Sequence, residues 1–153
     1  MRKWLIRNST RAILWTLAVV ARRPWLAPVS RVLGKSMAFV TIRTKAIGEA
    51  GDITELGALW QRSFPAKKQV PIELITTNTV IAQIHTPCPL RGSGDVQACY
   101  RMMQFDREVV GHAGGQFVVL ESQATPGVTY CRVAMRLKQE PIDDLVPAHE
   151  EPK

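Results

Sequence analysis

The spacing of apolar and polar residues divides the chain into two parts with different periods. Up to about residue 64, apolar residues recur every three or four positions, which is the period of an amphipathic helix. From Val70 onward the period becomes two, and apolar side chains alternate with polar ones from Ile72 to Thr76 and from Val80 to Ile84. Such alternation is typical of strands. The pattern therefore predicts helices followed by a sheet.

The helical part is divided into three segments. The first is an uncharged run at residues 12–21, whose ten residues would rise about 15 Å as a helix, half the hydrocarbon thickness of a bilayer. Pro24 and Pro28 interrupt the pattern, since proline does not continue a helix interior. Two further helices are expected, from Val29 to near Thr44 and from Glu55 to Phe64, the latter capped by Asp52 or Thr54.

The second part reads as two pairs of strands around one helix. Residues 77–78 separate the first two alternating runs and predict a β-hairpin. After a loop rich in proline and glycine, Asp95 is a favourable N-cap for a helix to about Gly111. The remaining strands are expected at Gln116 to Ser122 and Val128 to Lys138. The chain is therefore predicted to be an α+β protein in which basic N-terminal helices precede a β-β-α-β-β sheet domain.

Positive charge is concentrated in the N-terminal third. Residues 1–48 contain ten Lys and Arg and no Asp or Glu, a charge of +10, and the remainder carries −3, which gives +7 in total. After Gln139 the chain is acidic and contains three prolines, which predicts disorder. We therefore expect a basic amphipathic helical segment at 1–48, a cysteine-bearing α+β domain at 49–138 and an acidic disordered tail at 139–153.

The charged segment suggests a partner. Its basic residues are interleaved with tryptophan and aliphatic residues, which favours an anionic membrane surface bound through residues 1–45. Nucleic acid is disfavoured, because no zinc-finger, helix-turn-helix or RNP-like motif accompanies the charge. A signal peptide or anchor is an alternative, although Arg22 and Arg23 follow the apolar run where a cleavage site needs small residues. The expected location is the cytoplasm, peripherally at the membrane.

Three cysteines in the second half are the main candidates for chemistry. Cys88 lies on a loop between Pro87 and Pro89, Cys99 lies in the expected helix, and Cys131 lies in the last strand. An odd number of cysteines does not require a disulfide framework, so reduced thiols are expected. If the fold brings the three sulfurs together, they form a nucleophilic, metal-binding or redox site. If it does not, they are small buried core residues.

Each kind of thiol site makes different demands on the surrounding residues. A nucleophilic Cys88 facing a helix N-terminus would have a lowered pKa, and Asp106 or His85 would carry protons. Asp106 falls on the inward stripe of the expected helix, where burial would raise its pKa. A metal or iron–sulfur cluster would instead use Cys88, Cys99 and Cys131 as ligands, and His85 or His112 is the candidate fourth ligand of a closed zinc site.

Short motifs in the second half also suggest a family. Three short motifs follow one another in this half of the chain: Thr86-Pro87-Cys88-Pro89-Leu90, then Ala98-Cys99 with Asp106 following, then Gly127-Val128-Thr129-Tyr130-Cys131-Arg132-Val133. This succession resembles the L-2-amino-thiazoline-4-carboxylic acid hydrolase-like family. A more distant likeness is to small-molecule-binding domains of the 4-vinyl-reductase type. The resemblance covers roughly residues 70–138.

The resemblance implies a hydrolase-like domain that acts on a small sulfur- or nitrogen-containing heterocycle or amidine, cleaving non-peptide C–N bonds without a cofactor. In that mechanism the Cys88 thiolate attacks the electrophilic ring carbon, and water releases the product. Two alternatives stay open at this point. One is a binding or sensing module with a cysteine-ligated metal or iron–sulfur cluster, and the other is a non-catalytic membrane-associated accessory protein.

Overall fold

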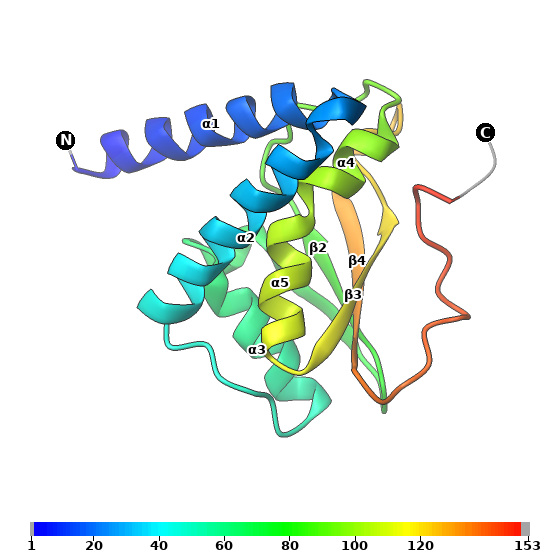
Figure 1. Cartoon of the computed structure of the whole chain (residues 1–153). Helices are drawn as coiled ribbons and strands as arrows, with labels where there is room; N and C mark the ends of the chain where they lie inside the picture. Colours follow the sequence, from blue (N-terminus) through cyan, green and yellow to red (C-terminus); the bar gives the residue numbers. More distant parts are fainter. Residues whose placement is uncertain (1, 151–153) are drawn as a thin grey trace.

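The computed structural model describes residues 2–150, and it describes side chains from residue 12 onward. Five α-helices and four strands form a mixed α+β architecture, as the sequence predicts (Figure 1). Two short 3-10 turns lie at Pro24–Leu26 and Lys67–Gln69. The helices are α1 Arg2–Ala21, α2 Ala27–Thr44, α3 Ile53–Ser63, α4 Val96–Met102 and α5 Gln104–His112, and the strands are β1 Ile72–Ile75, β2 Val80–Ile84, β3 Gly115–Glu121 and β4 Cys131–Leu137.

The sheet is antiparallel throughout, in the order β1-β2-β4-β3. The expected hairpin is β1 and β2, and β4 returns to lie between β2 and β3. In this register Ile84 at the end of β2 is paired with Cys131 at the start of β4. The loop that carries Cys88 therefore leaves the sheet at the end where β4 begins.

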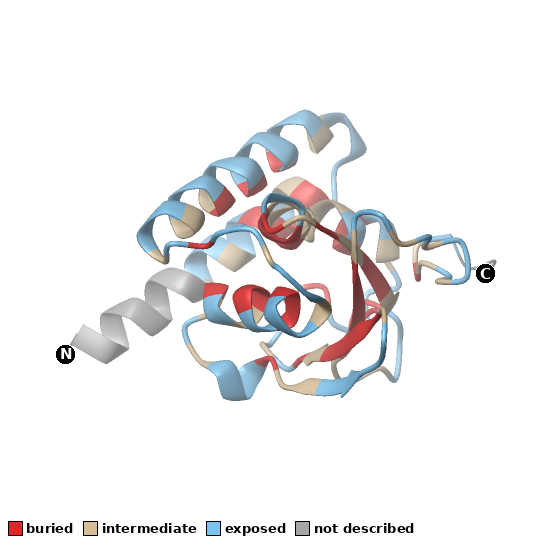
Figure 2. Ribbon diagram, turned by 90° about the horizontal axis from the view of Figure 1, so that it is seen from below, coloured by how far each residue is buried: buried red, intermediate tan, exposed pale blue. Residues whose placement is uncertain are grey.

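One face of the sheet packs against the helices. The main core is formed by Trp60 and Leu56 of α3, Val110 of α5, and the alternating residues of β2 and β4. Figure 2 shows that the buried residues gather between the sheet and the inner sides of the helices. Asp52 caps α3 by accepting a hydrogen bond from the Glu55 amide at 2.8 Å, as the sequence predicts.

The helix that begins after Asp95 differs from its prediction. Asp95 does cap it, accepting from the Ala98 amide at 2.8 Å, but Met103 leaves the helical conformation with ψ near 13° and divides the segment into α4 and α5. Directly after this break α5 packs closely on α2, where a Cβ added to Gly34 would lie 2.8 Å from the Cβ of Gln104. Tertiary packing against α2 thus accompanies the change of direction.

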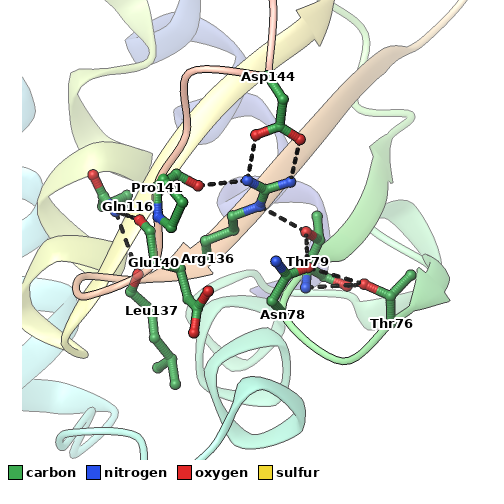
Figure 3. Close-up of polar contacts among 9 residues, drawn as sticks. All are labelled: Thr76, Asn78, Thr79, Gln116, Arg136, Leu137, Glu140, Pro141 and Asp144. Carbon is green, nitrogen blue, oxygen red and sulfur yellow. Dashed lines mark hydrogen bonds and ion pairs between the residues drawn. The ribbon is translucent and has the colours of Figure 1, made fainter.

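The C-terminal tail also differs from its prediction, because residues 139–150 pack on the body. Figure 3 shows the anchor: Arg136 of β4 makes a bidentate ion pair with Asp144, at 2.6 and 2.7 Å, and donates to the Thr79 hydroxyl at 2.7 Å. Arg136 alternates with the apolar residues Met135 and Leu137 of β4, a position that is usually solvated for an arginine, yet only 6% of its surface is exposed. Residues 139–150 thus pack around a buried cation that the composition of the tail did not reveal, and the disorder expected for the tail stays a prediction.

The tail then returns along the edge of the sheet. Figure 1 shows it running beside β3, on the side away from α5. The amide of Ala148 donates to the carbonyl of Val119 at 2.8 Å, and Gln97 of α4 donates to the carbonyl of His149 at 2.9 Å. The tail therefore protects part of an edge strand that would otherwise present unpaired backbone groups.

The N-terminal helices share cores with the rest of the chain. Ile47, just after α2, belongs to the main core, while Ala18 and Ala21 of α1 pack in a second cluster with Leu90 and Cys99. Arg101 of α4 also donates to the carbonyl of Ala21 at 2.6 Å. Among the described residues, no helix has the length and apolarity needed to cross a bilayer.

Candidate functional site

Two of the three cysteines lie beside the same short segment, residues 122–124, where Cys99 packs with Ala124 and Cys131 accepts from the Gln123 amide. Cys99 is the fourth residue of α4 and Cys131 is the first residue of β4, and their side chains are 2% and 1% exposed. Each thiol affects the pKa of the other. Both residues are therefore buried near one segment of the chain, and the convergence of all three sulfurs in one site stays a prediction.

The Cys131 thiol is the acceptor of the pair. Its sulfur accepts the backbone N–H of Gln123 at 3.3 Å. The hydrogen bond from Cys99 is the largest influence and lowers the pKa of Cys131, the two interactions with Gln123 lower it further, and burial and the nearby charge of Asp106 oppose them. For Cys99, donation to Cys131 and then burial raise the pKa strongly.

Gln123 holds the surroundings of Cys131 in place, although no local sequence pattern identifies it. Its side chain is fully buried and donates to the carbonyls of Ile84 and Thr86 at 3.0 and 3.1 Å. Its oxygen accepts from two nitrogens of Arg91, at 2.6 and 3.0 Å. The end of β2, the Cys88 loop and the residues after β3 are thus joined through one amide group. A glutamine in a loop is usually solvated, so no local pattern marks this role.

Cys88 is the most accessible of the three cysteines. It is half-buried, and its sulfur accepts the Leu90 amide at 3.4 Å. Burial raises the pKa of Cys88, and the opposing effects of the Leu90 amide, Arg91 and Arg22 are smaller. The expectation of a lowered pKa at this position is therefore wrong, because desolvation of the thiolate outweighs the nearby donors and positive charges.

Asp106 is the buried titratable group of this region. Only 6% of its surface is exposed, and it accepts a hydrogen bond from the indole nitrogen of Trp60 at 2.9 Å. Burial raises the pKa of Asp106 to about 6, with the Trp60 hydrogen bond and the charge of Arg107 opposing the shift. The carboxyl group thus lies inward with a raised pKa, as the helical stripe predicts. Its role in proton transfer stays a prediction.

Neither candidate histidine joins the thiols. His85 is exposed, contacts the side-chain oxygen of Gln83 at 2.7 Å and stacks on Tyr130 with ring centroids 5.0 Å apart. The ring of His112 lies 3.2 Å from the carbonyl oxygen of Ile47, so it sits beside the end of α2. Within residues 2–150, no group of three or more His, Cys, Asp or Glu residues is arranged to hold a metal ion. Metal binding by the three cysteines stays a prediction.

The space around the thiols is small. A cavity of about 10 Å³ borders Cys99, and Ala148 and His149 of the tail also line it. This volume is about what one water molecule needs. A larger hollow of about 190 Å³ lies elsewhere, between the start of α3 and the turn after β1, and its lining contains no cysteine. Pockets for small molecules usually measure hundreds of Å³. The hollow beside Cys99 is therefore far smaller than a small-molecule pocket.

A second candidate site lies on the outer surface of the N-terminal helices, which we call the α1–α2 face. Nine of the thirteen large apolar side chains that are exposed in the described residues belong to α1, α2 or the turn between them. On α2 they are spaced by three, four and seven residues and so share one side of the helix. The α1–α2 face comprises Ile13, Trp15, Val19, Trp25, Val29, Val32, Leu33, Phe39 and Val40.

The same helices bury mainly small residues on their other side. Ser30, Gly34 and Ala38 are the buried residues of α2, while Leu17, Ala18 and Ala21 are buried on α1. Basic side chains border the exposed apolar ones: the guanidinium of Arg43 lies 4.6 Å from the ring centre of Phe39. No acidic residue occurs before Glu49. The α1–α2 face is therefore apolar and cationic together.

Comparison of the chain with models of protein families, with curated proteins and with solved structures found no match. The resemblance of residues 70–138 to the hydrolase-like family accordingly stays a prediction, and the function is argued from the two sites themselves.

Proposed function

We propose that this protein binds the surface of anionic membranes through the α1–α2 face and holds its α+β domain against the bilayer. The observation that carries the proposal is the exposure of Trp15, Trp25, Val32, Phe39 and Val40, each more than half exposed, on helices that are otherwise cationic. Tryptophan and aliphatic residues bordered by Lys and Arg are the composition of helices that lie in the membrane interface.

The expected free energies of binding favour an anionic bilayer as the partner. Burying an aliphatic side chain contributes about 1.5 to 3 kcal/mol, and each Lys or Arg near an anionic surface contributes about 1 kcal/mol. Large exposed apolar patches on soluble proteins usually mark interaction sites. An acidic protein partner would match the charge but would have to cover two helices. A bilayer is apolar and anionic over any such area, so it fits both properties at once.

The test is co-sedimentation of the full chain with phosphatidylcholine vesicles that contain or lack phosphatidylserine. We expect binding only with phosphatidylserine, and we expect it to weaken steeply with salt, because the Debye length is about 10 Å at 0.1 M. Val32→Ser removes an apolar side chain that is 62% exposed on the α1–α2 face, and Val146→Ser removes a matched one, 57% exposed, on the tail.

We expect Val32→Ser to weaken binding about tenfold, the equivalent of the transfer free energy of one aliphatic side chain, and Val146→Ser to have no effect. Equal binding to neutral and anionic vesicles would contradict the electrostatic part of the proposal. Equal losses from both substitutions would contradict the assignment of the face. A chain that self-associates through this face instead would show Val32→Ser dissociating a dimer in the absence of lipid.

Hydrolysis by a thiol is a second candidate function, favoured by one specific observation. A carboxyl group with a pKa of about 6, Asp106, lies close enough to influence the ionisation of Cys131, and Cys88 lies nearby on a proline-flanked loop. In this scheme Cys88 attacks the electrophilic ring carbon of a small sulfur- or nitrogen-containing heterocycle or amidine, and Asp106 exchanges protons as the ring opens. Water then attacks the same carbon, and the bond to Cys88 breaks.

The substrate implied by the resemblance supplies the probe. Incubation with L-2-amino-thiazoline-4-carboxylate should release a free thiol, measurable colorimetrically after removal of the protein. Cys88→Ser should abolish this release, whereas Cys88→Ser should leave vesicle binding intact. Full turnover by Cys88→Ser would rule out the nucleophile.

A further inference from the structure

We infer that the outer side of β3 and β4 is a docking site for an extended acidic segment of a partner protein, and that the C-terminal tail occupies this site as a competitor. The inference is independent of membrane binding. The tail lies on the side of the sheet away from α5 (Figure 1), whereas α2 packs on α5. A bilayer bound at the α1–α2 face therefore leaves the docking site open.

The site is built around a guanidinium group that the sheet positions. The Nε atom of Arg136 donates to the Thr79 hydroxyl at 2.7 Å, and that hydroxyl donates to the side-chain oxygen of Asn78 at 2.9 Å (Figure 3). Arg136 belongs to β4, while Thr79 and Asn78 belong to the turn between β1 and β2. The orientation of the guanidinium is therefore set by residues outside the tail.

The other two nitrogens of this guanidinium hold one carboxylate. Nη1 and Nη2 of Arg136 lie 2.6 and 2.7 Å from the two oxygens of Asp144, the parallel geometry in which arginine recognises carboxylates. The two partners differ in burial: Arg136 is 6% exposed, whereas the Asp144 side chain is 66% exposed. An ion pair with an exposed partner is weak. The site is thus specific for a carboxylate and holds that of Asp144 loosely.

The tail uses little of the adjoining strand edge. Since β3 is the last strand of the sheet, its outer edge presents backbone groups that an added segment can bind. Residues 139–150 make one backbone hydrogen bond to β3, from the Ala148 amide to the Val119 carbonyl at 2.8 Å. The Leu145 amide instead donates to the carbonyl of Ile142 at 2.9 Å, a turn within the tail. An extended segment would pair with alternate residues of β3 and gain further backbone hydrogen bonds.

The contacts of the tail also define the chemistry of the partner segment. Residues 139–150 contain four acidic residues and no Lys or Arg, on a chain whose net charge is +7. Beyond Asp144, the ring of His149 stacks on Tyr100 with centroids 4.0 Å apart, and Gln97 donates to the His149 carbonyl at 2.9 Å. The fitting partner is therefore an acidic segment with a carboxylate for Arg136 and a planar ring for Tyr100.

The tail competes effectively because it is tethered. A segment on a short linker has an effective concentration in the mM range, so weak contacts keep the site occupied until a better-fitting segment arrives. Weakening the tail within the chain should consequently strengthen the binding of a separate segment.

The experiment titrates the isotope-labelled full chain with a synthetic peptide of residues 139–150 and follows the Arg136 Nε–H signal by NMR. We expect a saturable shift, and binding about fivefold tighter to the Asp144→Asn chain than to wild type, because the substituted tail no longer pairs with Arg136. The Asp143→Asn chain has the same net charge and should match wild type, since Asp143 makes no contact with Arg136 among the described hydrogen bonds.

Two substituted peptides separate recognition from net charge. On the Asp144→Asn chain, the Asp143→Asn peptide should bind like the parent peptide, whereas the Asp144→Asn peptide should bind at least fivefold more weakly. Equal binding of the two peptides would overturn the carboxylate site, and an Arg136 signal that does not shift in the Asp144→Asn chain would overturn the docking site. A wild-type dimer that Asp144→Asn dissociates would assign the site to the tail of a second copy and overturn the inferred partner.

Discussion

One side of α2 packs against the protein and the other side is exposed. The sizes of the residues on these two sides are the reverse of those in an ordinary surface helix. The side that faces α5 is lined by Ser30, Gly34 and Ala38, which are small. The side that faces away from the protein carries Val29, Val32, Leu33, Phe39 and Val40, which are large and apolar. A surface helix usually places its large apolar residues toward the core.

This contrast between the two sides of α2 shows that the large apolar residues are exposed even though α2 packs closely on the rest of the protein. Small residues let α2 approach α5 closely, and Lys35 adds an ion pair to Glu108 at 3.7 Å. The docking side is thus complete without any of the large apolar residues. Those residues keep 37–62% of their surface exposed in the described part of the chain, and the predictions below test the contrast between the interior and the outer surface.

The largest effect is expected at Asp106, in the interior below α5. Its pKa is about 6 in the folded chain against 3.8 as the reference value, so the folded state favours the protonated form. Stability is then greatest below pH 3.8 and falls as the pH rises through 6, by about 3 kcal/mol for a shift of about two units. Asp106→Asn keeps an acceptor for Trp60 and should lose this dependence.

Urea unfolding of both proteins between pH 4 and pH 8 measures the difference. Wild type should become less stable relative to Asp106→Asn across this interval, and the gap should stop widening above about pH 7. Parallel stability curves for the two proteins would show that Asp106 is not the buried acid described above.

An intermediate effect is expected from the packed side of α2. Gly34→Val places a branched side chain where a Cβ alone would lie 2.8 Å from the Cβ of Gln104, so overpacking should cost about 1 to 3 kcal/mol. Val32→Ala, two residues earlier on the exposed side, should change stability by less than about 0.5 kcal/mol. Thermal unfolding in the absence of lipid compares the two. A larger loss from Val32→Ala would mean that the α1–α2 face is covered by this chain itself.

The smallest effect is expected at the tail. Asp144→Asn removes the charge that pairs with Arg136, and because Asp144 is largely exposed the midpoint of thermal unfolding should hardly change. The Ala148 amide, which bonds to Val119, should nevertheless exchange its hydrogen severalfold faster, since the tail opens locally. Hydrogen exchange measured by NMR distinguishes the two responses. Faster exchange at every core amide would show instead that the ion pair supports the whole fold.

Local signals in the sequence predicted most of the fold. Period-two alternation located β1 and β2, and the caps Asp52 and Asp95 marked the starts of α3 and α4 because N-capping depends on nearby residues alone. The inward stripe likewise placed Asp106 in the core. These features are set within one or two turns of chain, so a pattern in the sequence is enough to find them.

Features that depend on distant segments were missed. The break at Met103 accompanies packing on α2, and the tail is ordered by Arg136, which reads as a solvated strand residue. Gln123 becomes a buried connector only because β2 ends beside it. The placement of Cys99 and Cys131 beside residues 122–124 could not be predicted either, since 32 positions separate the two cysteines and no spacing rule applies.

The most direct test of membrane binding uses the four tryptophans, reduced to one at a time by Trp→Phe substitution. Trp15 and Trp25 are 51% and 72% exposed on the α1–α2 face, whereas Trp60 is fully buried. With anionic vesicles whose acyl chains carry bromine, a contact quencher, we predict strong quenching of Trp15 and Trp25 fluorescence and none of Trp60. Unquenched Trp15 and Trp25 on vesicles that bind the protein would contradict the proposed orientation, and an absence of vesicle binding would contradict the proposed function.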